Sequence, residues 1–185
     1  MPEELIIQQG SPTLAGLKTG SLFSCPYRSE RELQEDIARL NRRLAPKGVC
    51  LRILRLRRRA LLYLYRPGSL RRDLAEAEVA AILREYGYTV DDAERCVEEL
   101  SERLQESGAF PHEIGLFLGY PAEDVRGFIE NRAQDCKYVG CWKVYGDEDA
   151  ARQRFAAYKK CTDVYCSQWA RGRSIERLTV PERFH

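Results

Sequence analysis

Residues 11–23 combine glycine, hydroxyl side chains and one lysine directly after an apolar segment at residues 5–7. A strand, a loop and a helix start in this order would present free backbone amides, and Lys18 would add a positive charge, so the stretch could hold phosphate or carboxylate. It is not a Walker A loop, because Leu17 separates Gly16 from Lys18. A tight structural turn followed by a capped helix explains the same residues equally well.

A ligand site is expected where this stretch meets residues 112–120. Lys18 and the loop amides would hold the anionic group of a small ligand, and ring side chains would contact its less polar part. The residues predicted to bind the ligand are Ser11, Thr13, Lys18, His112, Tyr120 and Trp142. For His112 the simpler interpretation is an ordinary residue at a helix start, because no second histidine follows at zincin spacing. Neither a catalytic residue nor a cofactor can be assigned.

The seven cysteines include two pairs with the same spacing, Cys136 with Cys141 and Cys161 with Cys166. Five residues along a strand place two side chains on opposite faces, and five along a helix rotate them by about 140°. We therefore predict no metal site and interpret the cysteines as thiols in a reducing compartment. An enzyme that uses Cys141 or Cys161 is a third hypothesis, after ligand binding and nucleic-acid binding.

Arginines beside Tyr63 and Tyr65 provide the alternative function, a nucleic-acid-binding regulator. Residues 113–131 also fit a helix-turn-helix template, although the second helix is acidic and would repel phosphate. The residues that would contact nucleic acid are Arg52, Arg55, Arg57, Arg58, Arg59 and Arg126. The same basic surface could instead pack near acidic helices of this chain or bind an acidic protein partner, so nucleic acid is the less favoured partner.

Hydrophobic periodicity predicts the elements that must position these residues. Ser29 and Glu32 form a capping box before a helix that extends to residue 44. The other predicted helices cover residues 69–86, 91–106, 112–118, 122–133 and 148–170, and the predicted strands are a hairpin at 49–56 and 60–65 and a buried strand at 137–145. The fold class is α+β, with a small antiparallel sheet that includes the basic hairpin and packs with several amphipathic helices.

The last predicted helix carries an aromatic stripe. Its members are Phe155, Tyr158, Thr162, Tyr165 and Trp169. We favour a core-facing seam over a stacking platform for a flat ligand, because apolar helical stripes are normally buried.

Composition narrows the class of protein. The chain has 185 residues, 44% of them hydrophobic, and a net charge of +2. That total hides a segregation, because residues 37–72 carry twelve basic and no acidic groups and residues 73–135 carry five basic and sixteen acidic groups. One domain over residues 1–185 is expected, with a possible division into a basic α/β part, 1–68, and a mainly helical part, 69–185. Without a secretory signal or a long apolar run, we expect a cytoplasmic protein without a membrane partner.

Three motifs together resemble a known family. They are SPTLAGLKTGSLF at residues 11–23, HEIGLFLGYP with a following DV and GFIEN at 112–131, and GCWKVY at 140–145. The chain resembles, over nearly its whole length, a domain-of-unknown-function family found mainly in anaerobic bacteria. This resemblance implies a cytosolic bacterial protein whose special residues lie in the three motifs. Our leading hypothesis is a small-ligand or cofactor binding or accessory protein of anaerobic metabolism.

Overall fold

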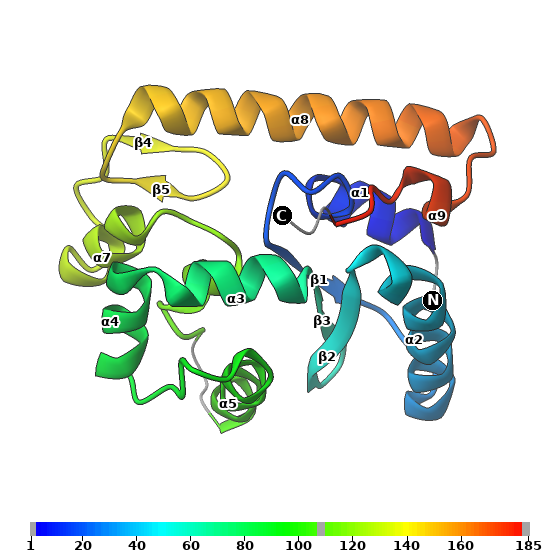
Figure 1. Cartoon of the computed structure of the whole chain (residues 1–185), viewed down its shortest axis with the longest axis horizontal. Coiled ribbons are helices and arrows are strands. Elements are labelled where there is room, and N and C mark those ends of the chain that lie inside the picture. Colours follow the sequence, from blue (N-terminus) through cyan, green and yellow to red (C-terminus); the bar gives the residue numbers. More distant parts are fainter. Residues whose placement is uncertain (1–2, 107–109, 183–185) are drawn as a thin grey trace.

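A three-stranded antiparallel sheet lies between two groups of helices (Figure 1). The computed structural model describes residues 3–106 and 110–182. The strands β1 (Gly20–Cys25), β2 (Cys50–Leu56) and β3 (Ala60–Tyr65) are arranged in the order β1-β3-β2. The α+β class and the hairpin of β2 and β3 are confirmed, whereas β1 begins inside residues 11–23, where the sequence predicted a loop and a helix start.

The central strand β3 contributes to both of the larger hydrophobic cores of the described chain. All six of its residues are buried, because β1 and β2 cover its edges and helices cover both faces. Leu61, Tyr63 and Tyr65 belong to one core, and the alternate residues Ala60, Leu62 and Leu64 belong to the other. This alternation follows from the two-residue period of a strand. A strand with both faces buried carries apolar side chains at every position.

The core around Leu62 and Leu64 is covered by N-terminal helices and by the end of the chain. These helices are α1 (Glu3–Leu14), α2 (Glu30–Leu44) and α9 (Ile175–Leu178). In α2, the Ser29 hydroxyl accepts a hydrogen bond from the Glu32 amide at 3.4 Å, which confirms the predicted cap. Asn41 of the same helix exchanges two hydrogen bonds with the backbone of Leu51 on the edge strand β2.

Helix α1 corrects the prediction for the N-terminal region. The apolar residues 5–7 are helical, and the helix continues through Ser11, Pro12 and Thr13 to Leu14. Gly10 allows α1 to approach the sheet, because a Cβ there would lie 2.4 Å from a methyl group of Leu64. The turn around Lys18 therefore follows the C-terminal end of a helix and precedes a strand, so the expected order of strand, loop and helix start is wrong.

The core around Tyr63 and Tyr65 is covered by helices from the acidic part of the chain. The predicted single helix over residues 69–86 is two helices, α3 (Pro67–Ala75) and α4 (Ala77–Glu85). They separate at Glu76, whose backbone is extended. Pro67 occupies the first turn of α3, where its missing N–H costs nothing. Helix α5 (Ala93–Glu106) agrees closely with its prediction.

The helix-turn-helix-like segment is shorter than predicted. It forms α6 (Ile114–Phe117) and α7 (Ala122–Glu130), and the predicted buried strand at 137–145 is a separate small hairpin of β4 (Tyr138–Val139) and β5 (Lys143–Val144). The turn between these strands begins at Gly140, where a Cβ would lie 2.2 Å from the Phe155 ring. The sequence run therefore reverses direction instead of adding a strand to the main sheet.

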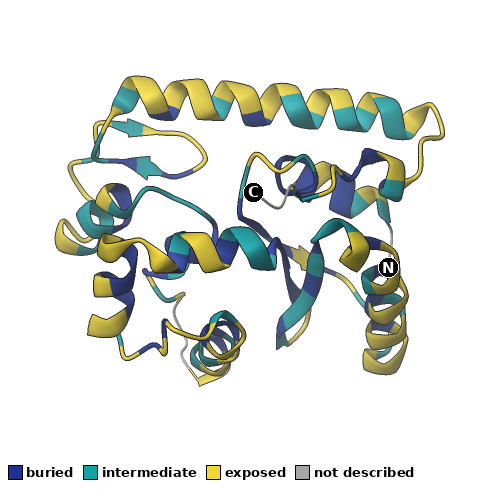
Figure 2. Cartoon of the chain, in the orientation of Figure 1, coloured by how far each residue is buried: buried dark blue, intermediate teal, exposed yellow. Residues whose placement is uncertain are grey.

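The long helix α8 (Glu148–Ala170) lies along α1 and extends from the small hairpin to α9 (Figure 1). Its solvent face is mostly exposed (Figure 2). Phe155 and Tyr158 pack with Trp142 in a third, smaller core, and Tyr165 and Trp169 pack on the core of α1 and α2. The aromatic stripe thus faces the protein interior, as predicted. In the described part of the chain, no helix has the length and apolar character needed to cross a membrane.

Candidate functional site

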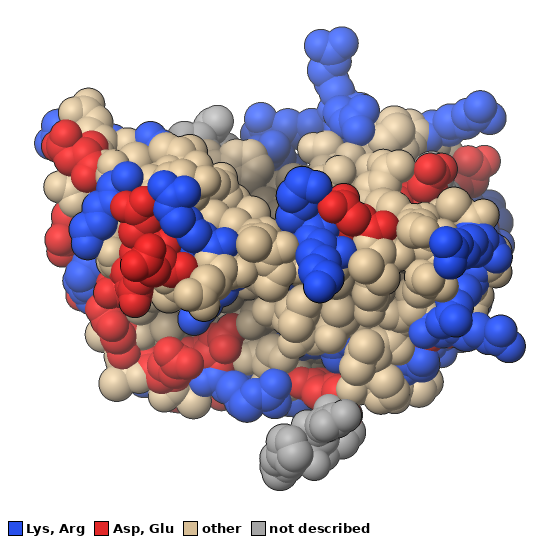
Figure 3. Space-filling model, turned by 90° about the horizontal axis from the view of Figure 1, so that it is seen from above, with Lys and Arg blue, Asp and Glu red and all other residues tan. Residues whose placement is uncertain are grey.

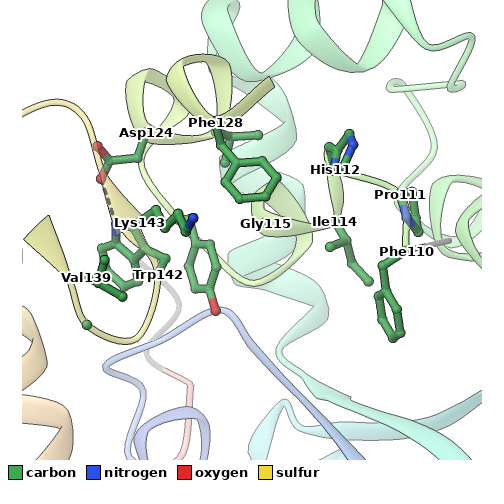
Figure 4. Close-up of a pocket in the computed structure, with 13 residues that line it drawn as sticks. Phe110, Pro111, His112, Ile114, Gly115, Asp124, Phe128, Val139, Trp142 and Lys143 are labelled. Carbon is green, nitrogen blue, oxygen red and sulfur yellow. Dashed lines mark hydrogen bonds between the residues drawn. The ribbon is translucent and has the colours of Figure 1, made fainter. Parts of the chain in front are cut away.

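The segment before α6, the two helices α6 and α7, and the small hairpin enclose an apolar pocket of about 360 Å³, here called the aromatic pocket (Figure 4). Five rings line it, those of Phe110, His112, Tyr120, Phe128 and Trp142. His112 and Phe128 lie with their ring centroids 5.3 Å apart. Tyr120 stacks on Trp142 at 4.5 Å with 29° between the ring planes.

Buried Asp124 fixes the position of Trp142. The Trp142 Nε1–H donates to Asp124 Oδ2 at 2.7 Å, and the backbone amides of Tyr145 and Gly146 donate to Oδ1 at 2.7 and 2.8 Å. The Asp124 side chain comes from α7, so its carboxylate ties this helix to the small hairpin. The Phe155 ring of α8 meets Trp142 edge to face, with centroids 4.5 Å apart. These contacts hold the indole in place without a ligand.

Close backbone packing shapes the other side of the aromatic pocket. A Cβ at Gly115 would lie 2.9 Å from both Tyr120 and Val125, so only glycine lets α6 meet the turn and α7 so closely. Two further lining residues, Phe110 and Val139, are 45% and 61% exposed. The pocket therefore has exposed apolar side chains among its lining residues.

A second, larger hollow of about 670 Å³, here called the polar cavity, lies between the turn before β1, α3, α4 and α8. Tyr120 lines both the polar cavity and the aromatic pocket. The Nζ atom of Lys18 lies 5.2 Å from the centroid of the Tyr120 ring and 6.0 Å from that of Tyr158. The neighbouring Thr19 donates a hydrogen bond to Asp73 Oδ2 at 2.5 Å.

Burial changes the acidity of the groups in the polar cavity. It lowers the pKa of Lys18 to about 8, and the nearby Cys141 opposes this change. Burial also raises the pKa of the Asp73 carboxyl, while the hydrogen bond from Thr19 acts against this rise. The pKa of Tyr120 is raised to about 12 because burial disfavours its phenolate. Lys18 therefore changes its charge closer to neutral pH than an ordinary lysine does.

The structure places the predicted ligand-binding residues in three locations: the aromatic pocket, the polar cavity, and the packing between α1 and β1. His112, Tyr120 and Trp142 lie together in the aromatic pocket, and Lys18 lies in the polar cavity next to Tyr120.

Ser11 and Thr13 are fully buried and line neither hollow. The Ser11 hydroxyl donates to the carbonyl of Ile7, and Thr13 shares a hydrogen bond with Ser21 at 2.9 Å. These bonds satisfy hydroxyl groups inside the packing of α1 on β1, so the two residues do not enter the proposals below.

Sequence reasoning missed Asp73, Asp124 and Phe128. Asp124 lies in α7 between the exposed Glu123 and Glu130, and Asp73 is the one acid of α3 and is partly buried. Periodicity alone does not show which carboxylate finds buried donors. The glycines of the 112–131 motif are a signal that could have indicated close packing there, as Gly115 shows.

The arginines predicted to contact nucleic acid mostly have partners within the protein. Arg52 forms ion pairs with Glu94 and Glu98 of α5. Arg55 and Arg57 donate to backbone carbonyls at the end of the same helix.

Two more of these arginines are also engaged. Arg59 donates to the carbonyl of Ser24, and Arg126 lies within 4.0 Å of three glutamates on α4 and α7. Arg58 is exposed. Figure 3 shows that basic and acidic side chains are also intermingled on the α8 face. These contacts favour the compensation of charges within the chain that the sequence analysis offered as an alternative.

The cysteines are free thiols in the structure. Over residues 3–106 and 110–182, no group of three or more His, Cys, Asp and Glu side chains could hold a metal ion. Burial raises the pKa of Cys161 to about 11, which makes it a poor nucleophile at neutral pH. Cys141 is exposed and close enough to Lys18 to influence its charge.

The fold and the two hollows define a small α+β protein with preformed cavities of ligand size. Residues 6–179 match the model of the family described as "Protein of unknown function (DUF3793)", and the chain belongs to this family. The resemblance to a domain-of-unknown-function family is thereby confirmed. No curated protein and no solved structure gives a significant match.

Proposed function

We propose that the protein binds a small molecule with a flat, mainly apolar ring system, and that the aromatic pocket is its binding site. The observation that carries this proposal is the fixed Trp142, which Asp124 holds by its Nε1–H while its ring forms part of the pocket lining. An indole that is oriented before binding lowers the entropic cost of stacking a ligand on it.

The size and chemistry of the pocket support a small ligand. Its volume of about 360 Å³ falls within the range of small-molecule sites, and such sites combine an apolar lining with a few polar groups. His112 supplies an imidazole beside Phe128, which suits a ring that carries a hydrogen-bonding atom at its edge. Lys143 also lines the pocket, but its ammonium group donates to the carbonyl of Ala133 at 2.5 Å.

The small anionic ligand expected from the sequence needs a different placement. Lys18 is not among the residues that line the aromatic pocket, so an anionic group held by Lys18 would occupy the polar cavity across Tyr120. The flat part of a ligand and an anionic group are therefore assigned to separate compartments. A role in anaerobic metabolism is part of the proposal and rests only on the resemblance of the sequence motifs.

Titration calorimetry with a panel of planar compounds tests the proposal. The probes are lumiflavin, haem, menadione and indole. We expect saturable binding of at least one probe, and Phe128→Ala should weaken it by about threefold to tenfold, the equivalent of one aromatic contact. His112→Ala should weaken the same probe, whereas Val164→Ala, which removes an exposed apolar side chain on α8, should not change its affinity.

Two results would contradict this function. One is that no planar probe binds. The other is binding that is equally strong in the Phe128→Ala protein, which would place the probe elsewhere on the surface. Each variant should first be shown to unfold cooperatively, so that a loss of binding reports on the pocket.

A further inference from the structure

The polar cavity contains an amine whose surroundings differ from those of an ordinary surface lysine. The Lys18 Nζ atom lies near the rings of Tyr120 and Tyr158, and the side chain lines a hollow of about 670 Å³. Within the described ranges, no carboxylate forms an ion pair with this ammonium group. By contrast, Lys159 on the surface of α8 pairs with Asp163 at 2.8 Å.

We propose that the amine of Lys18 forms a reversible imine with a small aldehyde or ketone that enters the polar cavity. The nitrogen lone pair adds to the carbonyl carbon and gives a carbinolamine. A C=N double bond then forms as the former carbonyl oxygen leaves in a water molecule, which also takes both amine hydrogens. The step consumes no oxidant or reductant, and the reverse reaction with water restores the lysine and the carbonyl compound.

The environment of Lys18 supports the first step of this reaction. Only the unprotonated amine is a nucleophile, and burial among rings disfavours the ammonium form. The lowering of the Lys18 pKa to about 8 has burial as its largest cause. At pH 7.5 an amine with this pKa is unprotonated on the order of a hundred times more often than one with an ordinary lysine pKa.

The environment also contains a group suited to the loss of water. Asp73 lines the same cavity, and Thr19, the residue after Lys18, binds its carboxyl group. Burial raises the pKa of this carboxyl, which favours retention of the proton that a departing hydroxyl group needs.

The charges of the cavity define the class of carbonyl compound. Tyr120, Tyr158 and Cys141 are the titratable groups whose interactions with Lys18 are described above. The other charged lining residues are Asp73, Glu76, Glu78, Glu123 and Arg154. Even without Asp73, the three glutamates outnumber the two cations, Lys18 and Arg154, so the cavity does not select for anions. A small neutral carbonyl compound fits this balance best, and an oxo acid would require Arg154 to hold its carboxylate.

Reductive trapping tests the proposal on the full chain. The protein is incubated at pH 7.5 with hydroxyacetone, a neutral ketone, or with pyruvate, an oxo acid, and sodium cyanoborohydride then reduces any imine to a stable secondary amine. Peptide mass spectrometry measures the adduct at each lysine. We expect the adduct at Lys18 to exceed that at Lys159 by about tenfold or more, and its yield to rise with pH around a midpoint near 8.

Matched variants make the result specific. Lys18→Arg keeps a positive charge without a nucleophilic amine and should remove the dominant adduct, while Lys159→Arg should leave it unchanged. Selective labelling of Lys18 by either ketone supports the imine, and the comparison of the two shows whether charge matters. Equal labelling of Lys18 and Lys159, or no adduct at Lys18 with either ketone, would overturn the proposal. No planar ligand is used, so this outcome is independent of the aromatic pocket.

Discussion

Asp124 is a single buried carboxylate that accepts hydrogen bonds from three donors, and these connect α7 to the small hairpin. Replacing it by alanine leaves the Trp142 indole and two backbone amides without a partner. We expect Asp124→Ala to lower the free energy of unfolding by about 2–4 kcal/mol, since each unsatisfied buried group costs about 1–3 kcal/mol and partial relaxation reduces the sum. Urea unfolding measures this loss.

The control for this prediction is Asp163→Ala, which removes an exposed acid whose pair with Lys159 lies on the surface of α8. It should change the unfolding free energy by about 0.5 kcal/mol or less. If Asp124→Ala were as mild as this control, the carboxylate would not be fixing the indole, and the preformed aromatic pocket would lose its main support.

Lys18 should reduce the stability of the folded protein at neutral pH. Its pKa falls to about 8 on folding, so between pH 8 and the ordinary lysine pKa the unfolded chain binds more protons than the folded chain. The loss of folding stability caused by the buried charge is therefore fully present below pH 8. We expect Lys18→Met to raise the unfolding free energy at pH 7 by about 1 kcal/mol, a value reduced because the side chain is only half-buried.

The pH dependence of this difference separates charge from packing. The stability advantage of Lys18→Met over the native chain should shrink as the pH rises from 8 towards 10, because the folded native chain then loses the buried lysine charge while the unfolded chain still keeps it. Urea unfolding of both proteins across this range measures it. A difference that stayed constant with pH would mean that methionine only packs better, and would contradict the charge argument.

At the scale of elements, the Arg66 side chain caps the C-terminal end of helix α1 and links it to the C-terminal segment of the chain. Its Nε donates to the carbonyl of Thr13, and its Nη2 donates to those of Leu14 and Val180, all at 2.7 Å. The side chain is 2% exposed, although nothing in its sequence position distinguishes it from the exposed arginines around it. The carbonyls at the end of a helix have no partner within the helix, and this guanidinium supplies one.

Arg66→Met should therefore lower the unfolding free energy by about 3 kcal/mol, because buried carbonyl groups lose charged donors. Urea unfolding measures the loss, and amide hydrogen exchange should show weaker protection at Val180, whose N–H donates to the carbonyl of Leu14 at 2.9 Å. The matched control is Arg58→Met, an exposed arginine of the hairpin turn, which should have little effect. Equal effects of the two substitutions would refute the capping role of Arg66.

The elements most accurately predicted from sequence are those whose pattern is local. The Ser29 cap and the leucine stripe of α2 predict this helix because both act within a few turns. The prediction failed at α1, where Gly10, Ser11 and Pro12 resemble a loop but are helical. Gly10 packs against Leu64 of the sheet, and the next residue of the helix, Thr13, bonds to Ser21, and neither contact is visible in a local pattern. It failed again at residues 137–145, where the close approach of Gly140 to Phe155 accompanies the reversal.

The candidate site was predicted only in part, for a related reason. Aromatic and basic residues in short motifs indicated Lys18, His112, Tyr120 and Trp142, and the structure places the last three in one pocket with Lys18 beside Tyr120. The division into two hollows depends on how α8 and the small hairpin lie against α6 and α7. That arrangement results from long-range packing, which no local pattern in the sequence contains.

At the scale of the whole molecule, the basic and acidic blocks of the sequence lie side by side, because helix α5 packs against strand β2. Arg52 of the basic hairpin pairs with Glu94 and Glu98 of the acidic helix α5. We therefore expect no saturable binding of single-stranded RNA or duplex DNA in fluorescence anisotropy at 50 mM salt. Binding that weakened steeply as salt increased would show an open cationic face and would contradict this account.

The proposed ligand site is tested most directly by the fluorescence of Trp142 itself. The chain has two tryptophans, so a Trp169→Phe variant leaves Trp142 as the only indole reporter. Titrating this variant with lumiflavin, haem or menadione should give saturable quenching with one binding site for at least one compound, and Phe128→Ala in the same background should weaken it by about threefold to tenfold. The contradictory result is quenching that stays linear and unsaturated for every compound.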